Sequence, residues 1–225
     1  MALVAFLDIL GSTEMVKKEK FTDIQILDFA NAVGIMAKFN LKVRFAVFSD
    51  SVIISCSEDL IRNFVSVLSF LYSQWFSDHI FVRGGIAIGD IRWVEHPPSD
   101  ELFQSLSNFT YSRVYGKALV EAYKIEQKSG PGAICFVSED ASSLFRKTNN
   151  YILDGLTNML IWTHKEGVEH WCKMFNFLLK NEIEDMELRR HLLATLRYFQ
   201  SLKNFGKDLP SSFDYDFREH ATSNQ

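Results

Sequence analysis

A short apolar run at the start of the chain constrains its fold more than any other feature. Residues 3–9, LVAFLDI, are apolar at both odd and even positions except at Asp8. A strand with one face in water would alternate apolar and polar residues, so a run without alternation indicates a strand covered on both faces. We therefore expect residues 3–9 to form a central strand of a sheet.

The next segments predict a helix and a hairpin. Thr22 and Gln25 have the spacing of a capping box, and apolar residues then recur at helical spacing. Residues 43–48 and 52–56 are both rich in β-formers and are separated only by the tripeptide SDS. Such a short connection predicts an antiparallel hairpin with Asp50 at its tip.

Further helices and strands follow in alternation. An apolar stripe after Ser57 predicts a second helix, and IFVRGGIAIGD predicts a strand over residues 80–88. A helix is expected over residues 116–128, and GAICFVS predicts a fifth strand. The order β-α-β-β-α-β, continued by a helix and a strand, predicts an α+β fold with a ferredoxin-like sheet and helices on one face.

The C-terminal part has a different pattern. Beyond Arg146 the apolar residues mostly recur at helical spacing, and a polar tail follows Pro210. We expect a main domain over residues 1–146 and a mostly helical extension packed on it over residues 147–225. Within the main domain, the loop WVEHPPSDELFQSLSNFT is expected to form a flap at an active site or an interface.

Composition limits the classes of function. The chain has 225 residues, 47% of them hydrophobic, and a net charge of −4. Nucleic-acid-binding modules usually carry an excess of Lys and Arg, so no direct nucleic-acid partner is expected. The N-terminus lacks a secretory signal and no segment is long enough to cross a membrane, which favours the cytoplasm and excludes a membrane partner. Three separated cysteines are expected to be buried free thiols.

Two aspartates are expected to converge. Asp8 ends the first strand and Asp50 lies at the hairpin tip, and these strands are neighbours in a ferredoxin-like sheet. Paired carboxylates repel each other unless a cation lies between them, and hard oxygen ligands suit Mg²⁺ or Mn²⁺. Two such ions support in-line phosphoryl transfer. The alternative is that Asp8 caps the next turn and Asp50 is an ordinary hairpin residue.

The residues after Asp8 suit a phosphate ligand. Gly11 allows a sharp turn, and the following N–H groups, with Ser12 and Thr13, would face what the metal ions hold. A nucleoside triphosphate fits this description. The glycines and lysines of P-loop and Rossmann motifs are missing from the sequence, as is the serine elbow of hydrolases.

Four motifs, in order, resemble class III nucleotidyl cyclases. They are FLDILGST, FSDSVII, RGGIAIGD and YGKALVEAYKIE, and they cover roughly the first 140 residues. The short length and the GKALVEAYKIE form are most similar to the stand-alone pyrimidine cyclases of bacterial Pycsar antiphage systems. That resemblance implies a lyase that makes cyclic UMP or cyclic CMP, a messenger that activates a separate effector.

The resemblance also implies site residues. Asp8, Asp50 and the Ile9 carbonyl would bind two divalent ions, Mn²⁺ or Mg²⁺, and residues 1–146 would be the catalytic domain. The family forms a head-to-tail homodimer in which each active site takes its metal ligands from one chain and other groups from the partner.

The chain departs from the family pattern in its last catalytic helix. Val120 occupies the position of a ribose-orienting Asn, and Lys124 occupies that of an Arg that stabilises the transition state. Lys124 can offer charge to the developing phosphorane, although without the planar fork of arginine. It could equally be a solvated helix lysine.

The base-reading positions also differ. The resemblance places the purine-reading pair at Ala46 and Arg113, and Phe48 is a further candidate for substrate binding. An arginine donor suits a carbonyl oxygen, and uracil presents two of them, so UTP is favoured over CTP. Arg113 could instead be a surface or phosphate-binding residue. Two alternatives stay open: an inactive nucleotide-binding signalling module, supported by Val120, and a purine cyclase acting on ATP or GTP.

A charged residue inside the 80–88 strand needs a partner. Arg83 lies between apolar residues, so its burial requires an acid, for which Asp90 is a candidate, or a phosphate. A structural ion pair is the favoured interpretation.

Overall fold

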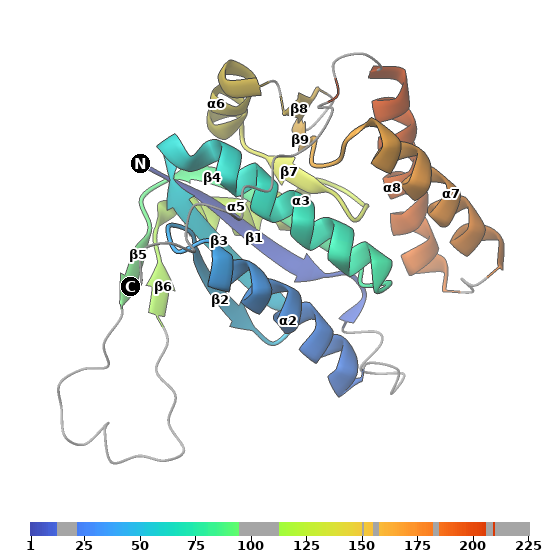
Figure 1. Cartoon of the computed structure of the whole chain (residues 1–225), viewed down its shortest axis with the longest axis horizontal. Coiled ribbons are helices and arrows are strands. Elements are labelled where there is room, and N and C mark those ends of the chain that lie inside the picture. The colour runs from blue at the N-terminus through green and yellow to red at the C-terminus, as the bar shows by residue number, and fades with distance from the viewer. Residues whose placement is uncertain are drawn as a thin grey trace, which may run out of the picture.

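The protein is built around one seven-stranded sheet (Figure 1). The structure, a computed structural model, describes residues 1–12, 22–94, 113–149, 151–154, 158–181, 185–205 and 209. The strand order is β2-β3-β1-β4-β7-β9-β8, and all neighbours are antiparallel except β4 and β7. In this order the strands are β2 (Arg44–Phe48), β3 (Ser51–Ser57), β1 (Ala2–Ile9), β4 (Val82–Gly89), β7 (Cys135–Val137), β9 (Asn158–Leu160) and β8 (Ile152–Leu153).

The first half has the predicted ferredoxin-like order. Helix α2 (Asp23–Phe39) connects β1 to the hairpin β2–β3, and α3 (Ile61–Ser77), preceded by the short 3₁₀ helix η1 (Glu58–Leu60), connects β3 to β4. The predicted capping box of Thr22 and Gln25 is present. β1 lies between β3 and β4, and its odd-numbered residues are fully or almost fully buried, so the prediction of a central strand is confirmed.

A third helix covers the opposite face of the sheet. Leu7 and Tyr72 of α3 lie on one face, where an added Cβ at Gly84 would meet both side chains. On the other face, Phe6 packs edge-on against Tyr123 of α5 (Lys117–Lys128), with ring centroids 5.2 Å apart. The prediction of helices on one face therefore holds for α2 and α3 and is wrong for α5. The strand pattern alone did not show which face α5 would cover.

Close packing of α5 depends on a glycine in β4. An added Cβ at Gly85 would overlap the Ala122 carbonyl oxygen and the Glu126 amide nitrogen. Only hydrogen at this position lets the helix backbone lie directly on the strand. This close approach brings α5 over the middle of the sheet.

The chain beyond residue 146 packs on the α3 side through an aromatic core. Phe76 of α3 is edge-on to Trp162, Trp171 and Phe175 at 5.3–5.6 Å between ring centroids. These rings belong to the segment after β9 and to α7 (Lys165–Asn181), which pairs with α8 (Met186–Phe205). Residue 146 lies inside α6 (Glu139–Asn149), and β8 and β9 extend the main sheet. The division into two units at residue 146 stays a prediction.

A separate ribbon stands beside the sheet. β5 (Arg92–Val94) and β6 (Arg113–Tyr115) pair antiparallel. The first two residues of the expected flap belong to β5, and its residues 95–110 lie outside the described residues. Cys56, Cys135 and Cys172 are free thiols, of which the first two are buried and Cys172 is partly buried. Within the described ranges, no helix is long and apolar enough to span a membrane.

Candidate active site

One row of side chains crosses the α5 face near the end of β1. Asp8 is opposite Ser51 of β3 on one side and opposite Arg83 of β4 on the other, and Ser51 is opposite Phe48 of β2. Paired residues in an antiparallel sheet project from the same face. The row Phe48, Ser51, Asp8, Arg83 therefore runs across four strands.

The register brings the two predicted metal-binding aspartates together. The Ser51 hydroxyl donates to Asp8 Oδ1 at 2.5 Å, and the Ile9 amide donates to the Asp50 carbonyl oxygen at 3.0 Å. Asp50 directly precedes Ser51 in the tight turn, where Ser49 has a positive φ of 54°. The expected convergence of Asp8 and Asp50 is thus a direct consequence of the hairpin and of its pairing with β1.

Electrostatics at this corner disfavour an ionised Asp8. Its pKa is raised from 3.8 to about 6, chiefly because burial removes the carboxylate from water. The negative charges of Asp50 and Glu126 raise the pKa further, whereas the Ser51 hydrogen bond and the Arg83 charge lower it. A cation bound here would relieve the repulsion and favour the ionised form.

A buried ion pair supports the row from beneath α5. Arg83 Nε lies 2.6 Å from Glu126 Oε1, and Arg83 Nη2 lies 2.5 Å from the same oxygen. The Glu126 side chain is fully buried, and Gln127 donates to its second oxygen at 2.6 Å. The predicted structural role of Arg83 is confirmed, with Glu126 as the partner and not Asp90. The available signal for Glu126 was its place on the stripe Ala118, Ala122, Glu126, the buried residues of α5.

The turn after β1 is described in part. Gly11 has φ +76° and is exposed, with open space around a built Cβ, so the sharp turn expected from glycine is present. Ser12 is buried, and Thr13 lies outside the described residues. The Leu10 amide donates to the Phe81 carbonyl oxygen at 2.8 Å, which ties the turn to the chain before β4.

The candidate base-reading positions are only partly placed. Ala46 is opposite Ile53 in β3, which is opposite Phe6, so Ala46 shares the α5 face with Asp8. Phe48 lies in the same row as Asp8 and is 39% exposed. Arg113 begins β6, and its side chain lies outside the described part of the structure.

The helix residues that depart from the family pattern point to solvent. Val120 is 53% exposed. Lys124 forms an ion pair with Glu121 on its own helix, at 3.9 Å, and both side chains are more than half exposed. In this single chain, Lys124 is thus engaged with α5 and not with the Asp8 corner.

The donor set fits a hard divalent cation bound together with a phosphate. The described residues hold no group of three or more His, Cys, Asp or Glu side chains that could form a metal cage. The predicted donors are two carboxylates and the Ile9 carbonyl oxygen, and Mg²⁺ sites commonly use one or two carboxylates together with substrate phosphates and water. Zinc sites usually take nitrogen and sulfur ligands, whereas the carboxylates predicted to bind metal here are hard oxygen donors.

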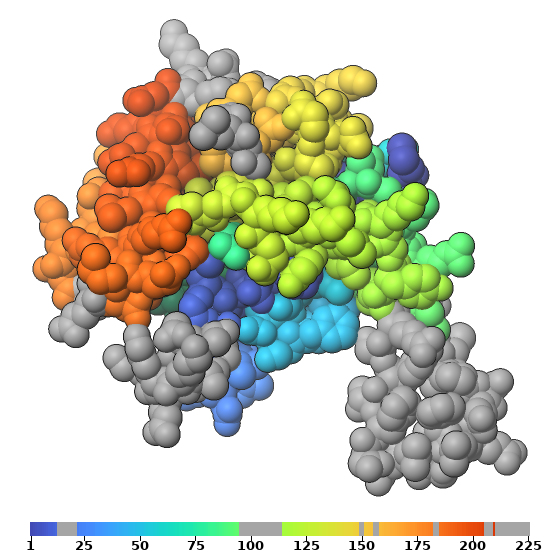
Figure 2. All heavy atoms as spheres, turned by 180° about the vertical axis from the view of Figure 1, so that it is seen from behind, coloured from blue at the N-terminus to red at the C-terminus, as the bar shows by residue number. Residues whose placement is uncertain are grey.

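Figure 2 views the molecule from the α5 side. The yellow-green α5 crosses above the blue N-terminal strand and the cyan hairpin, and the orange-red α8 lies beside them. In this view α5 and α8, two elements that are distant in sequence from β1, lie next to the N-terminal strand.

The arrangement of strands and helices is that of nucleotidyl cyclase catalytic domains. The sequence matches no protein-family model, and no curated protein matches it either. The likeness is in three dimensions and extends over about 70% of the chain.

Three solved structures illustrate this likeness. The guanylyl cyclase domain of the RhoGC fusion protein from the aquatic fungus Blastocladiella emersonii, in monomeric form, is 13% identical, covers 71% of this chain and 94% of its own, and has a TM-score of 0.51. The catalytic core of a rhodopsin-guanylyl cyclase with converted specificity, in complex with ATPαS, is 12% identical. It covers 71% of this chain and 94% of its own, with a TM-score of 0.51. The guanylate cyclase domain of RhGC from Catenaria anguillulae, in complex with GTP, is 13% identical. It covers 70% of this chain and 92% of its own, with a TM-score of 0.50.

Proposed function

We propose that the protein is a nucleotidyl cyclase that converts a nucleoside triphosphate to the 3′,5′-cyclic nucleotide and pyrophosphate. The observation that carries the proposal is the meeting of Asp8 and Asp50 at one corner of a cyclase-type sheet. A fold alone does not define an activity, and many folds host unrelated functions. Two converging carboxylates at the end of the first strand supply the chemistry that a fold alone does not define.

In this proposal the chain positions the nucleoside triphosphate and favours ionisation of its 3′-hydroxyl through bound metal ions. Asp8, Asp50 and the Ile9 carbonyl would hold two divalent ions, Mn²⁺ or Mg²⁺. When bound, such ions lower the pKa of the attacking 3′-hydroxyl and neutralise charge on the leaving pyrophosphate. The turn at Gly11, Ser12 and Thr13 would face the phosphates with its N–H groups.

We propose that the working form is a homodimer with active sites at its interface. Apolar side chains on and beside the α5 face are exposed in the single chain, as shown by Val120 at 53%, Tyr123 at 49% and Phe48 at 39%. A second copy packed on this face would cover them. It would also allow Lys124 of one chain to approach the metal-binding corner of the other, which a single chain does not do.

We further propose a pyrimidine substrate, UTP before CTP. Ala46 offers no polar atom to a base edge, and an arginine at position 113 would donate to a carbonyl oxygen, as uracil requires. The solved structures support the general point that this fold leaves the base open, since one relative binds GTP and another, with converted specificity, binds ATPαS. The resemblance in sequence motifs adds the biological role, a cyclic pyrimidine messenger for antiphage defence that acts on a separate effector.

The test is turnover with each nucleotide. Purified protein is incubated with Mn²⁺ and ATP, GTP, CTP or UTP separately, and products are identified by mass spectrometry. Asp50→Ala is the inactive variant, and Asp28→Ala, which changes an exposed aspartate of α2, is the matched control.

Each outcome decides between candidates. Cyclic UMP or cyclic CMP from the wild type and the Asp28 variant, with none from the Asp50 variant, would support the full proposal. A cyclic purine nucleotide would retain the cyclase and exclude the pyrimidine role. Nucleotide binding without any product would favour the inactive signalling module, and full activity of Asp50→Ala would overturn the two-metal mechanism.

A further inference from the structure

A groove on α8 is lined by three arginines. It has a volume of about 310 Å³, near the lower end of ligand-binding pockets. The α8 residues that line it recur at positions i, i+3, i+4, i+7, i+8 and i+11, so they occupy one face of the helix. Its lining comprises Pro131, Met186, Arg189, Arg190, Leu193, Ala194 and Arg197.

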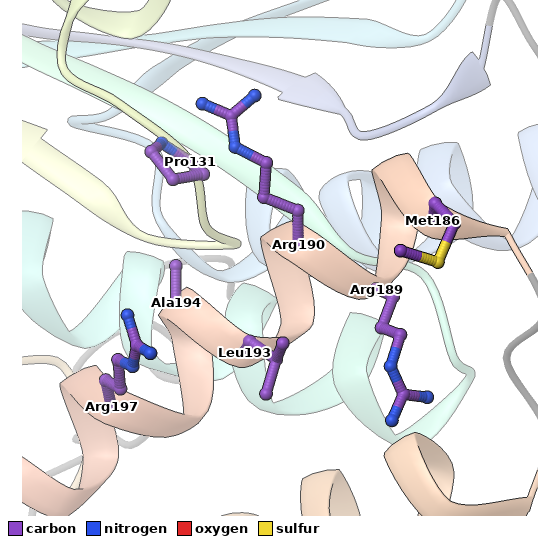
Figure 3. Close-up of a pocket in the computed structure, with 7 residues that line it drawn as sticks. All are labelled: Pro131, Met186, Arg189, Arg190, Leu193, Ala194 and Arg197. Atoms are coloured by element: carbon purple, nitrogen blue, oxygen red, sulfur yellow. The ribbon is translucent and has the colours of Figure 1, made fainter.

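The cationic groups of the groove differ in how firmly they are held. Figure 3 shows the Arg190 and Arg197 side chains extending toward the side of Pro131, whereas the Arg189 side chain extends away from it. The Arg189 guanidinium donates to the Leu179 carbonyl oxygen at 2.6 Å, which ties α8 to α7. Arg190 has a longer ion pair with Glu187, at 3.9 Å, in which both side chains are about two-thirds exposed. Arg190 and Arg197 are thus the cations that a ligand can engage.

α8 is fixed against the loop before β7. The Gly132 amide donates to His191 Nδ1 at 3.0 Å, and the Ala133 amide donates to Thr195 Oγ1 at 2.8 Å. His191 and Thr195 project between the arginine positions, so these bonds set the rotation of the helix. The groove face of α8 is therefore held in a defined orientation beside Pro131.

The same helix is coupled electrostatically to the row that contains Asp8. The positive charge of Arg83 contributes, after burial, to a lowered pKa of His191. Arg83 is directly opposite Asp8 in the sheet. Arg190 of the groove thus directly precedes a side chain whose pKa the charge of Arg83 lowers.

We propose that the arginine groove of α8 binds the phosphate chain of a nucleotide. Two guanidinium groups seven residues apart on a helix are separated by roughly 10 Å along the axis, and their long side chains can close on a chain of two or three phosphates. Arginine binds phosphate through two parallel hydrogen bonds, which a point charge such as lysine cannot form. The apolar side chains of Pro131 and Leu193 close the rest of the groove.

The phosphate chain could belong to either of two nucleotides. One is the substrate of the proposed cyclase, whose α-phosphate would lie at Asp8 and whose outer phosphates would reach α8; this source rests on the proposed function. The other is a second nucleotide that binds α8 and acts through Arg83 on the corner. The ligand chemistry is the same in both cases.

The test uses sodium tripolyphosphate and no metal ion. Isothermal titration calorimetry in EDTA compares the wild-type chain with Arg190→Ala and Arg197→Ala, and with Arg62→Ala as the control because Arg62 is an exposed arginine of α3. We expect one saturable site whose affinity falls at least about tenfold in either α8 variant and is unchanged in the control. Arg190→Lys should fail to restore the affinity fully.

Two results would overturn the proposal: no saturable binding by the wild type, or equal affinity in the wild type and both α8 variants. Melting curves by circular dichroism check that the variants are folded. Because the titration needs neither metal nor turnover, it decides this site even if the cyclase proposal fails. With a turnover assay in hand, a raised KM in Arg190→Ala would assign the groove to the substrate, and an unchanged KM would assign it to a second nucleotide.

Discussion

Replacing Asp8 by asparagine should stabilise the protein while removing its proposed activity. The pKa of Asp8 is raised from 3.8 to about 6 in the folded chain, so the folded state retains a proton that the unfolded state has released. Stability therefore falls as the pH rises from about 4 to about 6 and stays low above that range. The increase in the Asp8 pKa corresponds to a loss of stability of about 3 kcal/mol, at about 1.4 kcal/mol per pKa unit. Halving this energy for the partial exposure of the carboxyl leaves about 1.5 kcal/mol.

The assay is urea unfolding in EDTA at about pH 8 and about pH 4.5. Asparagine retains an oxygen that can accept the Ser51 hydrogen bond and carries no charge, so Asp8→Asn should gain about 1.5 kcal/mol at the higher pH and less than half of that at the lower. Asp28→Asn, on the exposed side of α2, should show no such pH-dependent gain. If Asp8→Asn were no more stable than the wild type at about pH 8, ionised Asp8 would not be disfavoured in the fold.

Two further predictions concern the packing of α5. Gly85→Ala should destabilise the fold by more than about 3 kcal/mol, because the added methyl group would overlap the Ala122 carbonyl oxygen. The control is Gly34→Ala, which lies in open space on α2 and should stabilise the fold by about 0.5–1 kcal/mol. Thermal unfolding followed by circular dichroism compares the two variants. Glu126→Gln should cost about 3–5 kcal/mol in urea unfolding because it leaves Arg83 buried without a counter-charge, and a loss under 1 kcal/mol would show that Arg83 finds another partner.

The first half of the fold could be predicted because its signals are local. The capping box at Thr22, the tripeptide between the hairpin strands and the unbroken apolar run before Asp8 each define an element within a few residues. The two- and three-residue strands β8 and β9 are too short to show a period, and α6 has few apolar residues in sequence. Their positions depend on contacts with distant segments, so the sequence pattern gave no indication of them.

The candidate site divides in the same way. The meeting of Asp8 and Asp50 could be predicted because a tight hairpin and a neighbouring strand fix the register between them. The partner of Arg83 could not be, because Glu126 is 43 residues away and reaches it only when α5 packs on the glycine of β4. The position of α8 beside the loop before β7 has no sequence signal, since it depends on hydrogen bonds from the Gly132 and Ala133 amides.

The electrostatics of the corner link stability to ligand binding. Among the described residues, the charges of Asp50 and Glu126 raise the pKa of Asp8 and the charge of Arg83 lowers it, so negative charge predominates around this carboxyl. A divalent cation bound with a triphosphate would offset this repulsion between negative charges, and it would do so only where the Asp8 carboxylate is present. Ligand at a hundredfold excess over its dissociation constant stabilises a protein by about 2.7 kcal/mol. Mn²⁺ with a bound nucleotide should therefore raise the melting temperature of the wild type but raise that of Asp8→Asn far less, and equal shifts in the two proteins would place the metal ion elsewhere.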